Sequence, residues 1–167
     1  PVIVLNGFSK VHLMSGWRIG YIAFNSSSKL DLIRENLPKL ARVRISTNLP
    51  VQYGALESLR GPQGYISEFV SELKKRRDFV IKRLNSISGL SCSNPKGAFY
   101  AFPKIEHSRY KSDRDFVLDL LRTKGVLTVH GSGFGTKYGS GHFRLVFLPD
   151  IQTLDLALNN IEEFVNQ

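Results

Sequence analysis

A regular stripe of apolar side chains predicts one long helix in the middle of this chain. The stripe consists of Ile66, Phe69, Val70, Leu73, Val80 and Leu84, which recur at helical spacing over several turns. The basic run from Lys74 to Arg77 falls mostly off this stripe, so we expect it on a solvated face. Any fold of the chain has to accommodate this helix.

Short apolar runs on both sides of the helix predict strands. We expect strands over residues 1–5, 19–24, 98–102, 126–129 and 143–147, the first of them buried. We expect further helices from residue 29, with Ser28 as N-cap and Pro38 kinking or dividing it, from Asn48 and Pro50 to about Leu59, from Ser112 to about Gly125, and after Asp150. Together these elements make an α/β chain.

The composition excludes several classes of protein. Of the 167 residues 42% are hydrophobic and 22% charged, and no apolar run approaches the roughly 20 residues of a membrane helix. Cys92 is the single cysteine, which excludes an internal disulfide and fits a reducing compartment, so we expect a cytoplasmic protein. The histidines share no metal-ligand spacing with one another or with Cys92, and we predict no metal site; they are His12, His107, His130 and His142.

The net charge of +9 raises the alternative of a nucleic-acid-binding protein. The densest basic cluster, Lys74 to Arg77, lies in the helical pattern and has no interleaved aromatic residues that could stack on bases. We therefore expect no nucleic-acid partner, and a salt-sensitive binding titration separates the two interpretations.

The residues that point most directly to chemistry lie near the start of the chain. Lys10 follows Ser9 and the apolar run of residues 1–5, and Arg18 comes eight positions later, before Gly20. An amine in a loop of small residues at a strand end is accessible to a carbonyl cofactor, with which it can form an imine. A guanidinium presents paired donors that match a phosphate group.

Residues 8–21 resemble the cofactor-lysine signature of the fold-type I pyridoxal-phosphate aminotransferases, the class I/II group that includes aspartate and alanine aminotransferases. Residues 97–103, 131–135 and 143–147 are similar to later landmarks of that family, in the same order. The resemblance implies the C-terminal portion of such an enzyme, with residues 1–60 ending the large-domain sheet and residues 61–167 forming the small α/β domain with its bridging helix. Because the chain opens directly on an apolar run without a methionine, we expect a piece of a longer protein.

The resemblance also implies roles for individual residues. Lys10 would carry pyridoxal 5'-phosphate as a Schiff base and act as general acid and base, and Arg18 would bind the cofactor phosphate. Ser9 either adds a hydroxyl donor to the cofactor or bonds to its own loop. Arg144 would form a forked pair with the substrate α-carboxylate. From its place in a predicted strand we expect Arg144 to be buried, where it needs a carboxylate or a ligand as partner.

Other residues in these segments are expected to be structural. Trp17, Tyr21 and Phe99 are predicted to lie in the core rather than line a site. Residues 131–135 lack the spacing of a nucleotide-binding loop and are predicted to form a tight turn that does not open a helix. Relatives often have proline at the position of His130, so the chain departs from the family pattern at this turn.

The resemblance implies transamination between an amino acid and a 2-oxo acid by a full-length homodimer, with this part of the chain alone inactive. Two alternatives stay open. Another fold-type I enzyme, such as a lyase or synthase acting on amino acids, would use the same lysine and arginines. A non-catalytic binding or dimerisation module would keep the scaffold without the cofactor chemistry.

Overall fold

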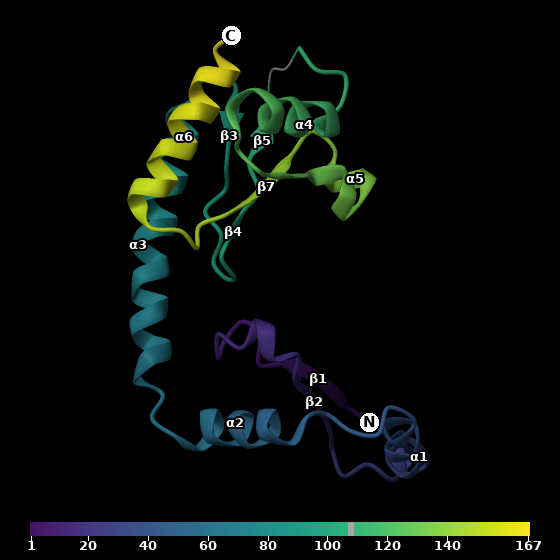
Figure 1. Ribbon diagram of the computed structural model, residues 1–167. Coiled ribbons are helices and arrows are strands. Elements are labelled where there is room, and N and C mark those ends of the chain that lie inside the picture. The colour runs from purple at the N-terminus through teal and green to yellow at the C-terminus, as the bar shows by residue number, and fades with distance from the viewer. Residues whose placement is uncertain (107–108) are drawn as a thin grey trace. The chain divides into compact units, whose positions relative to one another are not determined.

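The computed structural model describes residues 1–106 and 109–167, which form two compact units, Pro1–Glu68 and Phe69–Gln167. Figure 1 shows the elements of each unit along the chain. Both units mix helices and strands, so the α/β class predicted from the sequence is confirmed. His107, for which no role was expected, lies outside the described residues.

The first unit begins with an antiparallel hairpin of β1 (Ile3–Gly7) and β2 (Gly20–Phe24). The predicted strands are present, but the expectation that the first is buried is wrong, since every residue of β1 is exposed and Leu5 is 72% exposed. The sheet contains only these two strands within the described residues, and a two-stranded ribbon leaves most of its surface open to solvent.

Two whole helices also lie in the first unit. A 3₁₀ turn, Ser28–Leu30, leads into α1 (Asp31–Val43), so Ser28 lies inside the turn and Leu30, without a side-chain cap, is the N-cap of α1. Pro38 lies inside α1 without dividing it, because a proline removes a single ladder hydrogen bond and the turns on either side remain. The next helix, α2 (Leu49–Arg60), begins after Asn48 as predicted.

The predicted long helix is α3 (Gly64–Ser86), which runs from the end of the first unit into the second. The second unit contains a three-stranded antiparallel sheet in the order β4 (Tyr100–Ala101), β7 (Phe143–Val146), β6 (Val129–His130). A separate pair joins β3 (Leu90–Ser91) to β5 (Lys104–Ile105), in a segment where the sequence predicted no strand. The helices are α4 (Asp113–Lys124), α5 (Thr136–Gly139) and α6 (Ile151–Val165).

Two predicted strands are reduced to two residues each. The run 98–102 forms only β4, and its first residue is excluded because Ala98 has a φ of 58°, a left-handed conformation that a strand cannot continue through. The run 126–129 contributes only its last residue to β6. Residues 131–134 form a 3₁₀ turn and α5 begins after Gly135, so the expectation that this glycine-rich segment opens no helix is wrong.

The main core lies in the second unit. Leu73, Val80 and Leu84 of α3 share a buried cluster with residues of the other elements, among them Phe116, Phe143, Phe147, Leu158, Ile161 and Phe164. Helix α6 lies beside α3 in Figure 1. The two helices are also joined by a hydrogen bond of 2.6 Å from Arg83 to Asn159 Oδ1. Three positions of the predicted apolar stripe, Leu73, Val80 and Leu84, are thus part of this core.

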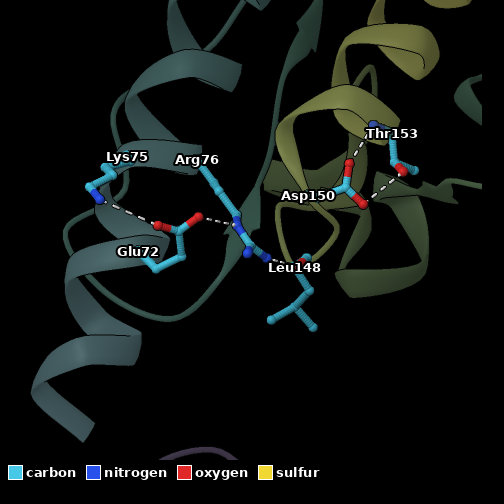
Figure 2. Close-up of polar contacts among 6 residues, drawn as sticks. All are labelled: Glu72, Lys75, Arg76, Leu148, Asp150 and Thr153. Carbon is cyan, nitrogen blue, oxygen red and sulfur yellow. Dashed lines mark hydrogen bonds and ion pairs between the residues drawn. The ribbon is translucent and has the colours of Figure 1, made fainter. Parts of the chain in front are cut away.

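The basic run of α3 is only partly solvated. Lys74 and Lys75 are exposed, but Arg76 donates to Glu72 Oε1 and to the backbone carbonyl of Leu148, as Figure 2 shows. Arg77 pairs with Asp78 at 2.6 Å. The expectation of a solvated face therefore holds for the two lysines but is wrong for the two arginines, which are half-buried and whose long side chains reach acceptors along and beyond the helix. Among the described residues, none of the helices is both long and apolar enough to cross a bilayer.

Candidate active site

The first candidate group of residues lies in the loop that joins β1 to β2. The strand register ends with Gly7 opposite Gly20, and Phe8 N donates to Ile19 O at 3.2 Å. A Cβ at Gly20 would lie 2.7 Å from the carbonyl oxygen of Asn6, so this close approach requires glycine. Residues 8–19 are therefore a loop whose two ends are held side by side.

A small apolar cluster anchors this loop. Phe8 and Met14 are buried with Ala55 of α2, and Met14 N donates to Phe8 O at 3.2 Å. His12 Nδ1 lies 2.9 Å from the hydroxyl oxygen of Tyr65, within the same unit. Because both the apolar side chains and His12 face these partners, the loop has a defined shape instead of extending freely into solvent.

Lys10 and Ser9 lie at the first bend of the loop, directly after buried Phe8. The backbone carbonyl of Lys10 accepts from Leu13 N at 3.4 Å, and its side chain is exposed, whereas Ser9 is half-buried. The loop therefore presents the lysine amine on its outer surface. An amine in that position is accessible to a small molecule that approaches the loop.

Arg18 lies where the same loop returns toward β2, after the 3₁₀ turn Ser15–Trp17. Its backbone is left-handed, with φ 53° and ψ 46°, which is uncommon for a residue other than glycine and redirects the chain here. One guanidinium nitrogen donates to Ser15 O at 3.0 Å, and the side chain is exposed. The remaining guanidinium donors are accessible to an anion.

The aromatic residues of this loop are exposed, so the prediction that they lie in the core is wrong. Trp17 is 48% exposed and Tyr21 is 43% exposed, while Phe99, in the second unit, is buried as expected. Tyr21 lies on the exposed hairpin, where its ring meets Phe8 at a centroid distance of 5.8 Å. The Trp17 ring lies against Gly54 of α2, where a Cβ would overlap it.

Arg144, in β7 of the second unit, is half-buried and not deeply buried as its sequence context suggested. Strand alternation explains the difference, because Phe143 and Phe147 face the core and Arg144 faces the other side of the sheet. Its guanidinium carbon lies 4.5 Å from the ring centroid of Tyr100 and 4.4 Å from that of Phe134. No carboxylate of the described residues forms an ion pair with it.

The structure thus brings Ser9, Lys10 and Arg18 together in one loop of the first unit and places Arg144 in the second. Sequence reasoning missed Tyr100 and Phe134, the aromatic neighbours of Arg144. The sequence holds no signal for Tyr100, because its place depends on the β4–β7 register, in which Tyr100 pairs with Val146, two residues beyond Arg144 on the same strand face. Within residues 1–106 and 109–167, no three His, Cys, Asp or Glu side chains are grouped to hold a metal ion.

Comparison with known proteins matches residues 1–161 to the family model described as aminotransferase class I and II. The glutamate-pyruvate aminotransferase AlaA of Escherichia coli (strain K12) is 35% identical over 170 residues, which cover 98% of this chain and 42% of that protein. A probable aspartate aminotransferase of Methanocaldococcus jannaschii is 37% identical over 164 residues, covering 96% of this chain and 42% of its own length.

Solved structures agree with these matches. An alanine aminotransferase from Pyrococcus furiosus has a TM-score of 0.93 and 51% identity, covering 99% of this chain and 42% of that one. An aminotransferase from Escherichia coli has a TM-score of 0.88 at 35% identity, with 98% and 42% of the two chains covered. The chain therefore spans about 42% of the length of these relatives.

Proposed function

The chain belongs to the aminotransferase class I and II family, and we propose that it is the lysine-bearing part of an enzyme that transfers an amino group from an amino acid to a 2-oxo acid. Residues 1–60 would end the large domain and residues 61–167 would form the small domain. The complete enzyme, proposed to be a homodimer, would require the remaining sequence of its relatives for activity.

The donor set of the β1–β2 loop fits pyridoxal 5'-phosphate. The cofactor carries an aldehyde and a phosphate, and this loop offers an exposed amine at Lys10 and an exposed guanidinium at Arg18. Ser9, half-buried beside Lys10, has a hydroxyl that can add a donor. When bound, the cofactor supplies an electron sink that stabilises negative charge at the substrate α-carbon.

The roles of the chain's own residues follow from their chemistry. Lys10 Nζ would hold the cofactor before substrate arrives, and afterwards the displaced amine would take the proton from the substrate α-carbon as a general base and deliver it to the cofactor carbon as a general acid. Arg18 would bind the phosphate end of the cofactor through its paired donors. The hydrogen bond from one guanidinium nitrogen to Ser15 O already orients this side chain.

Arg144 would bind the substrate carboxylate. It is a permanent cation without a carboxylate partner among the described residues, and its fork of donors matches a carboxylate. Residues in the remaining sequence of the complete enzyme would select the side chain of the preferred amino acid.

The observation that carries the proposal is the closed loop that holds both Lys10 and Arg18. Gly7–Gly20 pairing and the Phe8–Ile19 hydrogen bond join its ends, so one anchored loop supports both groups. An accessible amine and a phosphate donor on one anchored loop are what a covalently held, phosphorylated cofactor needs.

Borohydride reduction of the full-length protein with pyridoxal phosphate, followed by peptide mapping, tests the assignment. We expect the reduced adduct on Lys10, no adduct in Lys10→Ala, and a normal adduct in Lys29→Ala, which removes an exposed lysine elsewhere in the same unit. Adduct on another lysine would overturn the assignment. Amino transfer from an amino acid to 2-oxoglutarate is expected in the same preparation, and its replacement by elimination or condensation products would indicate a lyase or synthase.

A further inference from the structure

We propose that Tyr100 and Phe134 are positioning residues that hold the Arg144 guanidinium in place to receive the substrate carboxylate. The inference rests on the proposed carboxylate-binding role of Arg144 and adds two residues to it. Neither aromatic residue touches the reacting atoms in this proposal. Both act through the arginine.

The contacts of Arg144 are aromatic instead of ionic. Its guanidinium carbon lies over two rings, 4.5 Å from the Tyr100 centroid and 4.4 Å from the Phe134 centroid, within the range of a cation–π interaction. The faces of the rings attract the positive charge but leave the paired N–H donors of the guanidinium without a strong acceptor. The cation is therefore oriented while its hydrogen-bonding capacity stays available to a ligand.

The sheet register places Tyr100 beside Arg144. Tyr100 pairs with Val146 in the adjacent strand, and Arg144 lies two residues before Val146, so all three project from the same face of the sheet. Side chains at such diagonal positions on neighbouring strands lie within reach of long and aromatic residues. The opposite face of β7 is occupied by the core, which fixes the orientation of the strand.

A separate hydrogen-bond network places Phe134. The carboxylate of Asp113, only 6% exposed at the start of α4, accepts from Ser132 N at 2.6 Å and from Ser132 Oγ at 2.9 Å. Gly133 N donates to His130 Nδ1 at 3.1 Å. These bonds fix the 3₁₀ turn of residues 131–134, and Phe134 ends that turn over the guanidinium.

The two rings that hold the Arg144 guanidinium should strengthen its binding of a carboxylate. Arginine otherwise loses side-chain freedom when it grips a ligand, and a guanidinium already held by two rings loses less. The same rings exclude water from part of its surface, which strengthens its attraction for an anion. Removing either ring should therefore weaken the binding of carboxylate substrates without altering the chemistry at the α-carbon.

The test uses the full-length, cofactor-loaded enzyme with Phe134→Leu and Tyr100→Leu, which keep apolar bulk and remove the ring. We expect KM for the amino acid and for the 2-oxo acid to rise about tenfold in each variant, with kcat changed less than about twofold. Tyr100→Phe keeps the ring and should retain KM. Tyr138→Leu removes an exposed ring that lies against Lys137 in α5, and it should leave both constants unchanged.

A double-mutant cycle with Arg144→Ala separates positioning from a general structural effect. If Phe134 acts through the arginine, Phe134→Leu should add no further rise in KM once Arg144 is alanine. An additional rise of about tenfold in that background would show that Phe134 acts by another route and would overturn the inference. Because Phe134 is 51% exposed, its replacement should leave the unfolding midpoint unchanged.

The cycle also distinguishes failure of the inference from failure of the proposed function. If Arg144→Ala leaves KM unchanged, the carboxylate role of Arg144 is wrong and the inference falls with it. If Arg144→Ala raises KM strongly while Phe134→Leu and Tyr100→Leu behave like wild type, only the positioning role is wrong.

Discussion

Arg76, within α3, donates a hydrogen bond to the backbone carbonyl oxygen of Leu148, which lies between β7 and α6. The same guanidinium also donates to Glu72 Oε1, one helical turn earlier, at 3.1 Å, and Figure 2 shows both contacts. This hydrogen bond from Arg76 holds the pKa of the Glu72 carboxyl below its usual value. One side chain thus joins the long helix to the segment that leads into the last helix.

Replacing Arg76 with alanine should destabilise the second unit. The change removes the donor to the Leu148 carbonyl and the packing of a side chain that is 20% exposed, and we expect the free energy of unfolding to fall by about 1–2 kcal/mol. Urea denaturation of the protein measures the loss. Lys75→Ala is the matched control, because Lys75 is exposed and its 3.5 Å pair with Glu72 is a surface interaction worth little. Equal effects of the two changes would contradict the role of Arg76.

Replacing Asp150 with asparagine should flatten the acid dependence of stability. The pKa of the Asp150 carboxyl is lowered because the backbone N–H of Thr153 donates to it at 2.9 Å, and the Thr153 hydroxyl adds a second bond. A folded-state pKa below the unfolded value of about 4 gives stability that is fully present above that value and is lost as the pH falls through the folded pKa.

Asparagine caps a helix as well as aspartate but does not titrate in this range. The urea midpoint of Asp150→Asn should therefore match wild type at about pH 7 and decline less between about pH 5 and about pH 2. Asp150→Ser should behave in the same way, while Asp150→Ala should be less stable at neutral pH. If the urea midpoints of wild type and Asp150→Asn fall equally as the pH is lowered, the Asp150 carboxylate makes no contribution to the pH dependence of stability.

Alanine at Gly139 should be destabilising. A Cβ at this position would overlap the backbone carbonyl oxygen of Gly131, where α5 closes against the 3₁₀ turn of residues 131–134. Backbone has to move to relieve that overlap, so we expect a loss of about 1–3 kcal/mol in the free energy of unfolding. Gly97→Ala is the control, because no atom lies within 4 Å of a Cβ built there. A Gly139→Ala protein as stable as Gly97→Ala would show that the two segments do not approach this closely in solution.

Lysine at Arg18 should weaken cofactor retention in the full-length enzyme. The change keeps the positive charge but removes the paired donors that match a phosphate, so the dissociation constant for pyridoxal phosphate should rise about tenfold. Absorbance titration of the cofactor-free protein measures it. Arg60→Lys, at the exposed end of α2, should leave the constant unchanged. An unaltered affinity in Arg18→Lys would remove Arg18 from the cofactor site.

Features that depend on residues close in sequence were predicted well. The helices α2, α3 and α4 and the terminal helix α6 lie where their apolar spacing and caps indicated. The predicted cap of Ser112 on Asp115 N is present at 3.1 Å. Helical periodicity and capping involve neighbours within a few residues, so the linear order of the chain already contains the necessary information.

The candidate site residues include both a feature that could be predicted from the sequence and one that could not. That Lys10 and Arg18 share one loop could be predicted, because the apolar runs on either side of the loop pair with each other. That Arg144 lies against Tyr100 and Phe134 could not, since these three residues come from different segments. Their meeting depends on the β4–β7 register and on a turn held by Asp113, which lies before β6 in the chain.

By itself, the sequence determined the positions of most helices and identified the family, and it predicts Lys10 and Arg18 as the pair that would hold a phosphorylated aldehyde. Only the tertiary structure decided that β1 is exposed, that Arg76 reaches Leu148 and that aromatic rings, not carboxylates, surround Arg144. The reason is physical: local hydrogen bonds and side-chain periodicity are set by near neighbours, whereas burial and long-range partners are set by which segments pack together.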